Sequence, residues 1–222
     1  MISTGNDIIS LNAINVTRTK QPRFYSKILS GAERSLYNTP EFAAIPLASF
    51  VWLLWSVKES AYKFLKRIDP ELVFTPIKFE VEQLHVPATF TITHVEPEEF
   101  EGLGFDDRPV LKGILSKGDI QLYSRSLVYD NLILSVVNST DDFDNIYWGI
   151  KSIGNADHHT QSAAVREFLV ASLQNVLDDE DITISKTPQG IPVLLSGGKV
   201  TQIPVSLSHH EHLIAYSFQL NK

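Results

Sequence analysis

The sequence contains no cysteine and a single methionine among its 222 residues. The lack of cysteine excludes disulfide bonds, thiolate metal sites and a cysteine nucleophile, and it is compatible with a cytoplasmic protein. Long hydrophobic runs are also lacking, because the longest apolar stretch, 45–57, contains Ser49 and is too short to cross a bilayer. The first residues show no basic region followed by an apolar run, so we expect no signal peptide.

Basic residues are fewer than acidic ones, with 19 Lys and Arg against 26 Asp and Glu, and the formal net charge is −7. Nucleic acid and acidic membranes both attract a basic surface, so we expect neither as a general partner. Before Glu41, however, basic residues outnumber acidic ones. A local basic face for an acidic partner is therefore predicted from Arg18, Arg23, Lys27 and Arg34.

Hydrophobic periodicity predicts both helices and antiparallel strands. Apolar residues recur at helical spacing from Leu47 to Ile68, after Pro46 and before Pro70, which predicts a long amphipathic helix. Alternation elsewhere predicts a strand near 8–11, an antiparallel meander between 70 and 137, and a second small sheet. Further helices are expected at 23–29, at 30–37 from a Ser30/Glu33 capping box, and at 164–176. The expected strands include 77–81, 90–92, 182–184, 191–195, 205–207 and 213–218.

These elements predict an α+β fold of two similar lobes, each with helices packed on a small antiparallel sheet. The polar segment 138–144 is a natural join between them. We therefore expect one lobe over residues 1–145 and another over residues 146–222. Length and composition alone are equally compatible with one larger domain.

One side of the long helix has an unusual composition. Trp52, Trp55, Glu59, Lys63 and Lys66 cluster on the side opposite the apolar stripe. Two tryptophans are unexpected on a solvated face, so they indicate a second contact surface or a pocket wall. The alternative for Glu59 and Lys63 is an ordinary i,i+4 pair, which contributes about 0.2–0.5 kcal/mol on any exposed helix.

Asp7 is an isolated carboxylate at the start of the first predicted strand, close to Gly5, where a metal or phosphate can approach the backbone. Magnesium prefers oxygen ligands and is often held by one or two carboxylates together with substrate phosphates. Asp7 and Glu59 would suffice for such a site. The alternative is that Asp7 is a turn residue that accepts a hydrogen bond from its own backbone.

Hydroxyls and imidazoles gather at the end of a predicted strand, in Ser206, Ser208, His209 and His210. Such groups donate hydrogen bonds to phosphate oxygens. A zinc site built from His209, His210 and His212 is a rival, although adjacent residues on a strand point to opposite faces. Plain turn residues are a further alternative.

Four segments, in this order along the chain, resemble the phosphopantetheinyl transferase superfamily. Gly5 to Ile9 resembles its Gly-x-Asp-Ile motif, and Trp55 to Lys63 resembles its more specific Trp-x-x-Lys-Glu-Ala-x-x-Lys motif. The segment 189–192 lies where the family often has Gly-Lys-Pro, and 206–209 is similar to its Ser-x-Ser-His segment. Residues 23–33 also resemble the stretch after the first motif.

The sequence departs from the family pattern at Ser60, where the family has alanine, and at Ile191, where it has lysine. Ile9 replaces the second acid of the long, two-lobed branch, so the metal site resembles the two-carboxylate version of the short holo-carrier-protein synthases. The length is nevertheless that of the two-lobed branch, in which the motifs follow the reverse order. This suggests a pseudo-dimer with permuted lobes and an active site between them.

The resemblance implies transfer of the 4'-phosphopantetheine group of coenzyme A to a serine of an acyl- or peptidyl-carrier protein, with release of adenosine 3',5'-bisphosphate. Asp7 and Glu59 would bind Mg²⁺, and Lys63 would neutralise phosphate charge. Glu59, or a water that it orients, would accept the serine proton. The implied contacts with coenzyme A are Lys58, Lys63, Pro192, Ser208 and His209.

The implied partner is an acidic carrier protein of fatty-acid, polyketide or peptide synthesis, docking on Arg18, Arg23 and Lys27. A pseudo-dimer favours a monomer in solution. Two other functions stay open at this point. The chain could be another metal-dependent phosphoryl or pyrophosphate enzyme, or a non-catalytic coenzyme A-binding module on the same fold.

Overall fold

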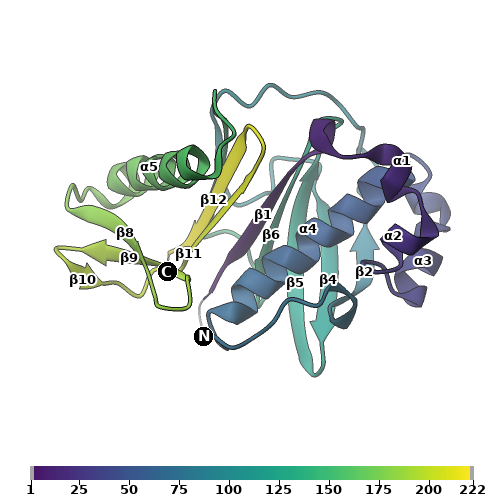
Figure 1. Ribbon diagram of the computed structural model, residues 1–222, viewed down its shortest axis with the longest axis horizontal. Coiled ribbons are helices and arrows are strands. Elements are labelled where there is room, and N and C mark those ends of the chain that lie inside the picture. The colour runs from purple at the N-terminus through teal and green to yellow at the C-terminus, as the bar shows by residue number, and fades with distance from the viewer. Residues whose placement is uncertain (1–2, 221–222) are drawn as a thin grey trace.

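The computed structural model describes residues 3–220 as antiparallel sheets with few helices (Figure 1). The helices are α1 (Val16–Thr19), α2 (Pro22–Tyr25), α3 (Gly31–Tyr37), α4 (Leu47–Lys66) and α5 (His158–Leu177), with 3₁₀ turns at Leu11–Ala13, Pro40–Phe42 and Pro76–Lys78. The strands are β1 (Gly5–Ser10), β2 (Glu80–His85), β3 (Phe100–Leu103), β4 (Leu111–Lys117), β5 (Ile120–Val128), β6 (Leu132–Asn138), β7 (Ile146–Ser152), β8 (Ile182–Lys186), β9 (Pro192–Ser196), β10 (Lys199–Val200), β11 (Val205–His210) and β12 (Leu213–Gln219). Across residues 3–220, no helix combines the length and the apolar character that a bilayer crossing requires.

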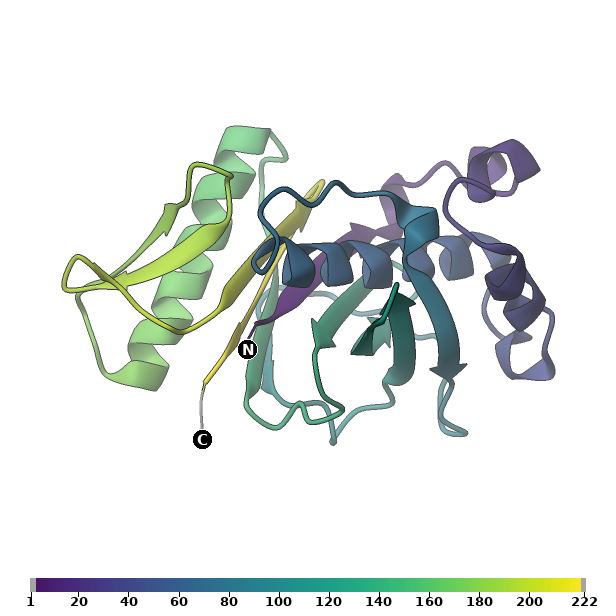
Figure 2. The same cartoon turned by 90° about the horizontal axis from the view of Figure 1, so that it is seen from below.

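The first sheet has the order β1-β6-β5-β4-β2, and α4 lies across one of its faces (Figures 1 and 2). The apolar stripe of α4 and the facing side chains of the sheet form the largest core cluster, in which Phe50, Val57 and Phe64 are buried. A Cβ on Gly5 would lie 2.0 Å from the backbone oxygen of Ser60. The glycine is therefore required by the close approach of β1 to α4, which corrects the expectation that it leaves room for a ligand.

The second half of the chain forms two sheets instead of the single one expected. One has the order β11-β12-β7-β3, and the other is the small sheet β10-β9-β8. The helix α5 packs on β12, β11 and β8 (Figure 1). Strand β3 precedes the predicted boundary at residue 145 yet pairs with β7. The division into 1–145 and 146–222 stays a prediction, and β3 crosses it.

Both halves repeat one arrangement. The first strand of each half pairs antiparallel with its last, β1 with β6 and β7 with β12. Each half also carries one helix of 20 residues, α4 or α5. The mixed α/β class with antiparallel sheets is as expected, and the pseudo-dimer remains a prediction that this repetition favours.

Strands β1 and β11 lie side by side at the edges of the two larger sheets (Figure 1). Side chains join them: the backbone N–H of Asn6 donates to Oγ of Ser206 at 3.0 Å, and that of Ser10 donates to Nδ1 of His210 at 2.8 Å. The amide of Asn6 also donates to Oγ of Ser208 at 2.7 Å. Polar side chains of β11 thus satisfy the edge of β1 and hold the two sheets together.

Most predicted elements are confirmed. The long helix is α4, the helix at 164–176 is part of α5, and 205–218 forms the hairpin β11–β12 with Glu211 at a φ of 54° in its turn. Both capping-box bonds of Ser30 and Glu33 are present at the start of α3.

Three local predictions are wrong or displaced. Residues 90–92 form a loop, in which Phe90 packs on the core without strand pairing. The helix expected over 23–29 ends at Tyr25, because the N–H groups of Lys27 and Ile28 bond carbonyls only three residues back. The strand expected at 77–81 begins only at Glu80, after a 3₁₀ turn that starts at Pro76.

Candidate active site

Two carboxylates from distant parts of the chain meet at one lysine ammonium. Strand β1 supplies Asp7, and α4 supplies Glu59 and Lys63. Nζ of Lys63 lies 3.0 Å from Oδ1 of Asp7 and 3.5 Å from Oε1 of Glu59. It also donates to the backbone oxygen of Asn6 at 3.0 Å. The three side chains predicted from sequence as catalytic are therefore neighbours.

Burial and the opposite charges of this cluster shift the pKa values of Asp7 and Lys63. Burial raises the pKa of Asp7 to about 7, although Lys63 acts in the opposite direction. Burial also disfavours the charge of Lys63, but Asp7 and Glu59 outweigh it and hold the pKa of this ammonium above its usual value.

The oxygens of the cluster suit a hard cation. Oδ2 of Asp7 is buried and has no hydrogen-bond partner within residues 3–220. An unpartnered carboxylate oxygen that lies beside a second carboxylate offers the donor chemistry that Mg²⁺ prefers. In the same part of the chain, no three His, Asp or Glu side chains gather as a metal cluster. The residues present therefore fit an ion held by two carboxylates and completed by substrate and water.

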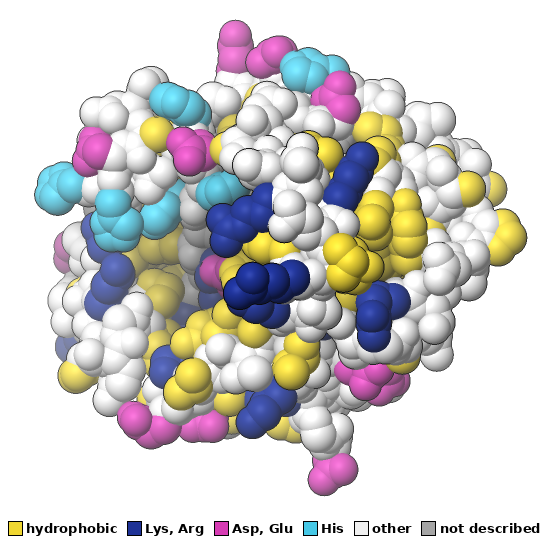
Figure 3. Space-filling view, turned by 45° about the vertical axis from the view of Figure 1, so that its right-hand side comes forward, with side chains coloured by type: hydrophobic (Ala, Val, Ile, Leu, Met, Phe, Trp, Pro, Cys, Tyr) yellow, Lys and Arg dark blue, Asp and Glu magenta, His cyan; other side chains and the backbone are white. Residues whose placement is uncertain are grey.

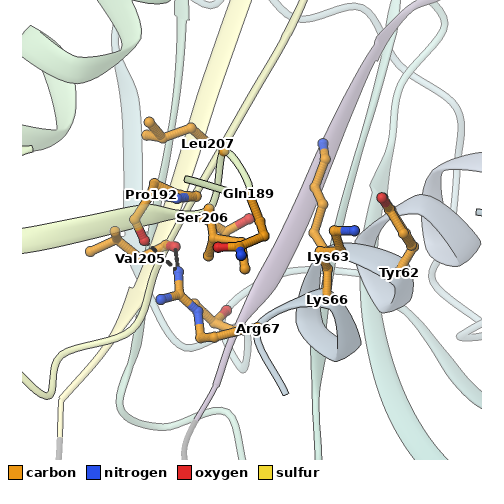
Figure 4. Close-up of a pocket in the computed structure, with 12 residues that line it drawn as sticks. Tyr62, Lys63, Lys66, Arg67, Gln189, Pro192, Val205, Ser206 and Leu207 are labelled. Carbon is orange, nitrogen blue, oxygen red and sulfur yellow. Dashed lines mark hydrogen bonds between the residues drawn. The ribbon is translucent and has the colours of Figure 1, made fainter. Parts of the chain in front are cut away.

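A basic cavity of about 210 Å³ opens beside the cluster (Figure 4). The end of α4 lines it with Lys63, Lys66 and Arg67, and residues 189–192 and 205–207 form the other wall. Nη2 of Arg67 donates to the backbone oxygen of Pro192 at 3.0 Å and to that of Val205. Arg67 therefore ties the helix to β9 and β11 across this cavity.

A second cavity of about 120 Å³ shares Gly190, Pro192 and Leu207 with the basic cavity and adds Arg166, Lys186 and His209. Burial lowers the pKa of His209, and the nearby His158, Lys63 and Lys186 lower it further. The rings of His158 and His209 are 5.2 Å apart. Positive charge thus accumulates around His209, and a bound anion would relieve the repulsion.

The aromatic cavity, with a volume of about 660 Å³, lies at the other end of the site. Trp52, Trp55, Phe24 and Phe74 are among its lining residues, together with Arg18, Lys27 and His210. Nε1 of Trp52 donates to Oγ1 of Thr19 at 3.0 Å. The predicted role of the two tryptophans as a pocket wall is confirmed.

One stripe of α4 connects these parts. It runs from Trp52 and Trp55 on the aromatic cavity, through Glu59, to Lys63 and Lys66 on the basic cavity. Figure 3 shows a hollow on this face with Lys, Arg and His side chains around it and an acidic side chain between them. The arrangement can hold an extended ligand with anionic groups at one end and less polar groups at the other.

The structure gives Lys58 a different place from the one expected. Its ammonium is fully buried, 2.7 Å from Oε2 of Glu33 and 2.6 Å from the backbone oxygen of Ile28. Burial lowers its pKa, against the opposing effect of Glu33. Residues on a helix that are adjacent in sequence point about 100° apart, so Lys58 faces inward while Glu59 faces the site. This corrects the predicted contact of Lys58 with coenzyme A.

The histidine-bearing hairpin contributes other residues than expected. Ser208 is 3% exposed and bonded to Asn6, and it lines neither basic-side cavity, which corrects its predicted place at a phosphate. Ser206 lines the basic cavity instead. Nδ1 of His212 contacts the backbone oxygen of Ile153, and Nδ1 of His210 accepts a hydrogen bond from the N–H of Ser10 on β1. The rival zinc site of His209, His210 and His212 is therefore not formed.

Sequence reasoning placed Lys66 on the helical stripe without giving it a role, and it missed three further basic residues of the cavities, which are Arg67, Arg166 and Lys186. Of these, Arg67 carried a signal, since it follows directly on the helical stripe. Ile9, in contrast, is buried in the core on the α4 side of β1. The position that carries a second acid in the long branch is thus part of the hydrophobic core.

One of three comparisons with known proteins finds a match. Residues 3–104 match the family model of the 4'-phosphopantetheinyl transferase superfamily. Over these residues, which make up less than half of the chain, the sequence is similar to that superfamily. Neither a curated protein nor a solved structure matches the chain.

The matched range includes Asp7, Glu59 and Lys63 and ends at Gly104, before β9 and β11. Phosphopantetheinyl transferases use coenzyme A as substrate and usually a divalent metal ion. The match therefore supports phosphopantetheinyl transferase activity in general. Pro192 and His209 lie outside the matched range.

Proposed function

We propose that the protein transfers 4'-phosphopantetheine from coenzyme A to a serine of an acyl- or peptidyl-carrier protein and releases adenosine 3',5'-bisphosphate. One observation supports the proposal: Glu59 on the stripe of α4 and its neighbour Asp7 on β1 lie between a basic cavity and an aromatic one. Coenzyme A has the same order of parts, with phosphates at the nucleotide end, a pyrophosphate in the middle and a less polar pantetheine arm.

The basic side accounts for the nucleotide end. Lys66, Arg67, Arg166 and Lys186 surround the two joined cavities with positive charge, which favours phosphate groups. Half-buried His209 donates to an anion in its protonated form. Pro192 lies in the wall that both cavities share and limits the room for the adenine.

The carboxylate pair accounts for the transfer. Asp7 and Glu59 would hold a divalent cation, which when bound neutralises charge on the pyrophosphate. The carrier serine oxygen forms a bond to the phosphorus of the phosphopantetheine, and the bond from this phosphorus to the bridging oxygen breaks. The electron pair of that bond leaves with adenosine 3',5'-bisphosphate. Glu59, or a water that it orients, accepts the serine proton.

The aromatic cavity accounts for the carrier side. Arg18 and Lys27 line it and suit an acidic partner, whose modified serine must approach Glu59. Arg23 is exposed nearby, whereas Arg34 lines a separate cavity with Tyr37. We therefore assign carrier docking to Arg18, Lys27 and Arg23.

The proposal is tested by incubating the protein with an apo-carrier protein, coenzyme A and Mg²⁺ and weighing the carrier by mass spectrometry. We expect the carrier to gain the mass of one phosphopantetheine group. Glu59→Gln keeps the size of the side chain and removes its charge, so we expect at least a 100-fold slower reaction, as for loss of one major electrostatic group. Lys112→Gln, on the exposed side of β4, is the control that should react like the wild type.

The same assay separates the other two functions. Phosphate or nucleotide release from coenzyme A with no change in carrier mass would indicate a different phosphoryl or pyrophosphate enzyme. Binding of coenzyme A that is indifferent to Mg²⁺, again with unchanged carrier, would indicate a binding module. Either result with several apo-carriers would reject the transfer reaction.

A further inference from the structure

The ammonium of Lys63 is surrounded by oxygens of Asn6, Asp7 and Glu59. A lysine ammonium has three N–H groups. Those of Lys63 face the backbone oxygen of Asn6 at 3.0 Å, Oδ1 of Asp7 at 3.0 Å and Oε1 of Glu59 at 3.5 Å. In this position the ammonium is engaged by the carboxylates and the backbone, although Lys63 also lines the basic cavity.

The same two carboxylates are the ones that fit a divalent ion. An ion that takes oxygens from both Asp7 and Glu59 would lie within a few ångströms of the ammonium. Like charges at such a separation repel strongly where burial reduces the screening by water. The ammonium and the ion are therefore alternative counter-charges for one pair of carboxylates.

We propose that Lys63 and a divalent cation compete for the carboxylates of Asp7 and Glu59, so that binding of the ion displaces the ammonium into the basic cavity. The inference rests on the proposed function, since it assigns the ion to these two residues. The side chain of Lys63 is 23% exposed and the residue already lines the basic cavity, so the ammonium has room to turn into it. After the exchange, its three donors are available to phosphate oxygens there.

Competition makes an unusual prediction for metal binding. Two ligands that exclude each other from one site lower each other's affinity by the same factor. Removing the ammonium in Lys63→Met should therefore tighten binding of the ion in the absence of coenzyme A, by about tenfold. A lysine that only assists phosphate binding would leave this affinity unchanged.

The measurement is a calorimetric titration with MgCl₂, repeated with Mn²⁺ followed by electron paramagnetic resonance. Lys66→Met is the matched control, because the ammonium of Lys66 donates to the backbone oxygen of Leu72 at 2.9 Å and does not contact the two carboxylates. The affinity of this variant for the ion should equal that of the wild type. Glu59→Gln should weaken binding in either background. An affinity in Lys63→Met equal to or below that of the wild type overturns the proposal, as does the absence of ion binding to both proteins.

A second measurement on the wild type decides the matter if Lys63→Met does not fold. Acetic anhydride at limiting concentration labels lysines according to their accessibility, and mass spectrometry of peptides reports each site. Mg²⁺ should accelerate the labelling of Lys63 and leave that of Lys66 unchanged. Equal or slower labelling of Lys63 with Mg²⁺ refutes the exchange.

These measurements need no carrier protein, so they fail independently of the proposed transfer. Tighter ion binding in Lys63→Met with no modification of any carrier would keep the exchange and reject the transfer. Carrier modification with unchanged ion affinity in Lys63→Met would keep the transfer and reject the exchange.

Discussion

The buried pair of Lys58 and Glu33 should be the most sensitive ionic contact of the fold. Both side chains are fully buried, and Nζ lies 2.7 Å from Oε2. Glu33 also accepts from the N–H of Ser30 and of Val81, each at 2.8 Å. One carboxylate thus fastens the start of α3 and strand β2 to the middle of α4.

We expect Lys58→Met to lower the free energy of unfolding by about 3 kcal/mol. Breaking a buried ion pair by removing one partner costs about 3–5 kcal/mol, because the other charge stays buried without compensation. The two backbone donors that Glu33 keeps place the expected loss at the lower end of that range. For a chain of this length, the loss corresponds to a Tm lower by about 6–12 °C.

Urea unfolding followed by circular dichroism measures the effect, with the midpoint and the slope fitted separately. Removing the leftover charge as well should recover part of the loss, so Lys58→Met with Glu33→Gln is expected to cost less than the two single changes added together. The control is Lys66→Met, which removes a half-buried ammonium at the end of α4. Its free energy of unfolding should stay within about 1 kcal/mol of the wild-type value.

A loss below about 1 kcal/mol for Lys58→Met, or additive losses in the double variant, would refute the buried pair. The kinetics offer an independent check. Because the ammonium of Lys58 lies away from both basic-side cavities, the folded variant should keep a KM for coenzyme A within about twofold of the wild type. A large rise in this KM would indicate that Lys58 does contact coenzyme A.

Three further predictions concern single positions. Gly5→Ala should lower the free energy of unfolding by about 3 kcal/mol or more, because its Cβ would lie 2.0 Å from the backbone oxygen of Ser60. The control is Gly31→Ala, whose Cβ would meet its nearest neighbour, the Arg34 side chain, at 3.8 Å and should be tolerated. The midpoints of urea unfolding measure both effects. Affinity for adenosine 3',5'-bisphosphate should rise from pH 8 to pH 6 more steeply in the wild type than in His209→Asn. The reason is that the lowered pKa of His209 rises when an anion binds, so that binding takes up a proton. Equal slopes of affinity against pH in calorimetry would show that His209 does not contact this ligand. Arg67→Met should lower the free energy of unfolding by about 2–3 kcal/mol and raise the KM for coenzyme A, with partial rescue by Arg67→Lys. An unchanged KM would show that the hydrogen bonds of Arg67 to β9 and β11 do not shape the cavity.

The sequence by itself determined the elements whose causes are local. The helical period of α4, the capping box of Ser30 and Glu33, and the hairpin β11–β12 all depend on residues within a few positions of one another. The stripe that carries Glu59 and Lys63 was also readable, because helix geometry alone places residues three and four apart on one face.

Only the tertiary structure decided what that stripe faces. The meeting of Asp7 with Lys63 depends on packing between β1 and α4, and the two cavities depend on the approach of the second sheet. Helix geometry separates Lys58 from the stripe of Lys63, but only the tertiary structure shows that one ammonium is buried against Glu33 and that the other lies at the site. Likewise, alternation placed Ser206 and Ser208 on one side of β11, but only the neighbouring β1 showed that their hydroxyls hold two sheets together. Contacts between residues far apart in the chain are set by the packing of whole elements, which the spacing of residues along the chain does not specify.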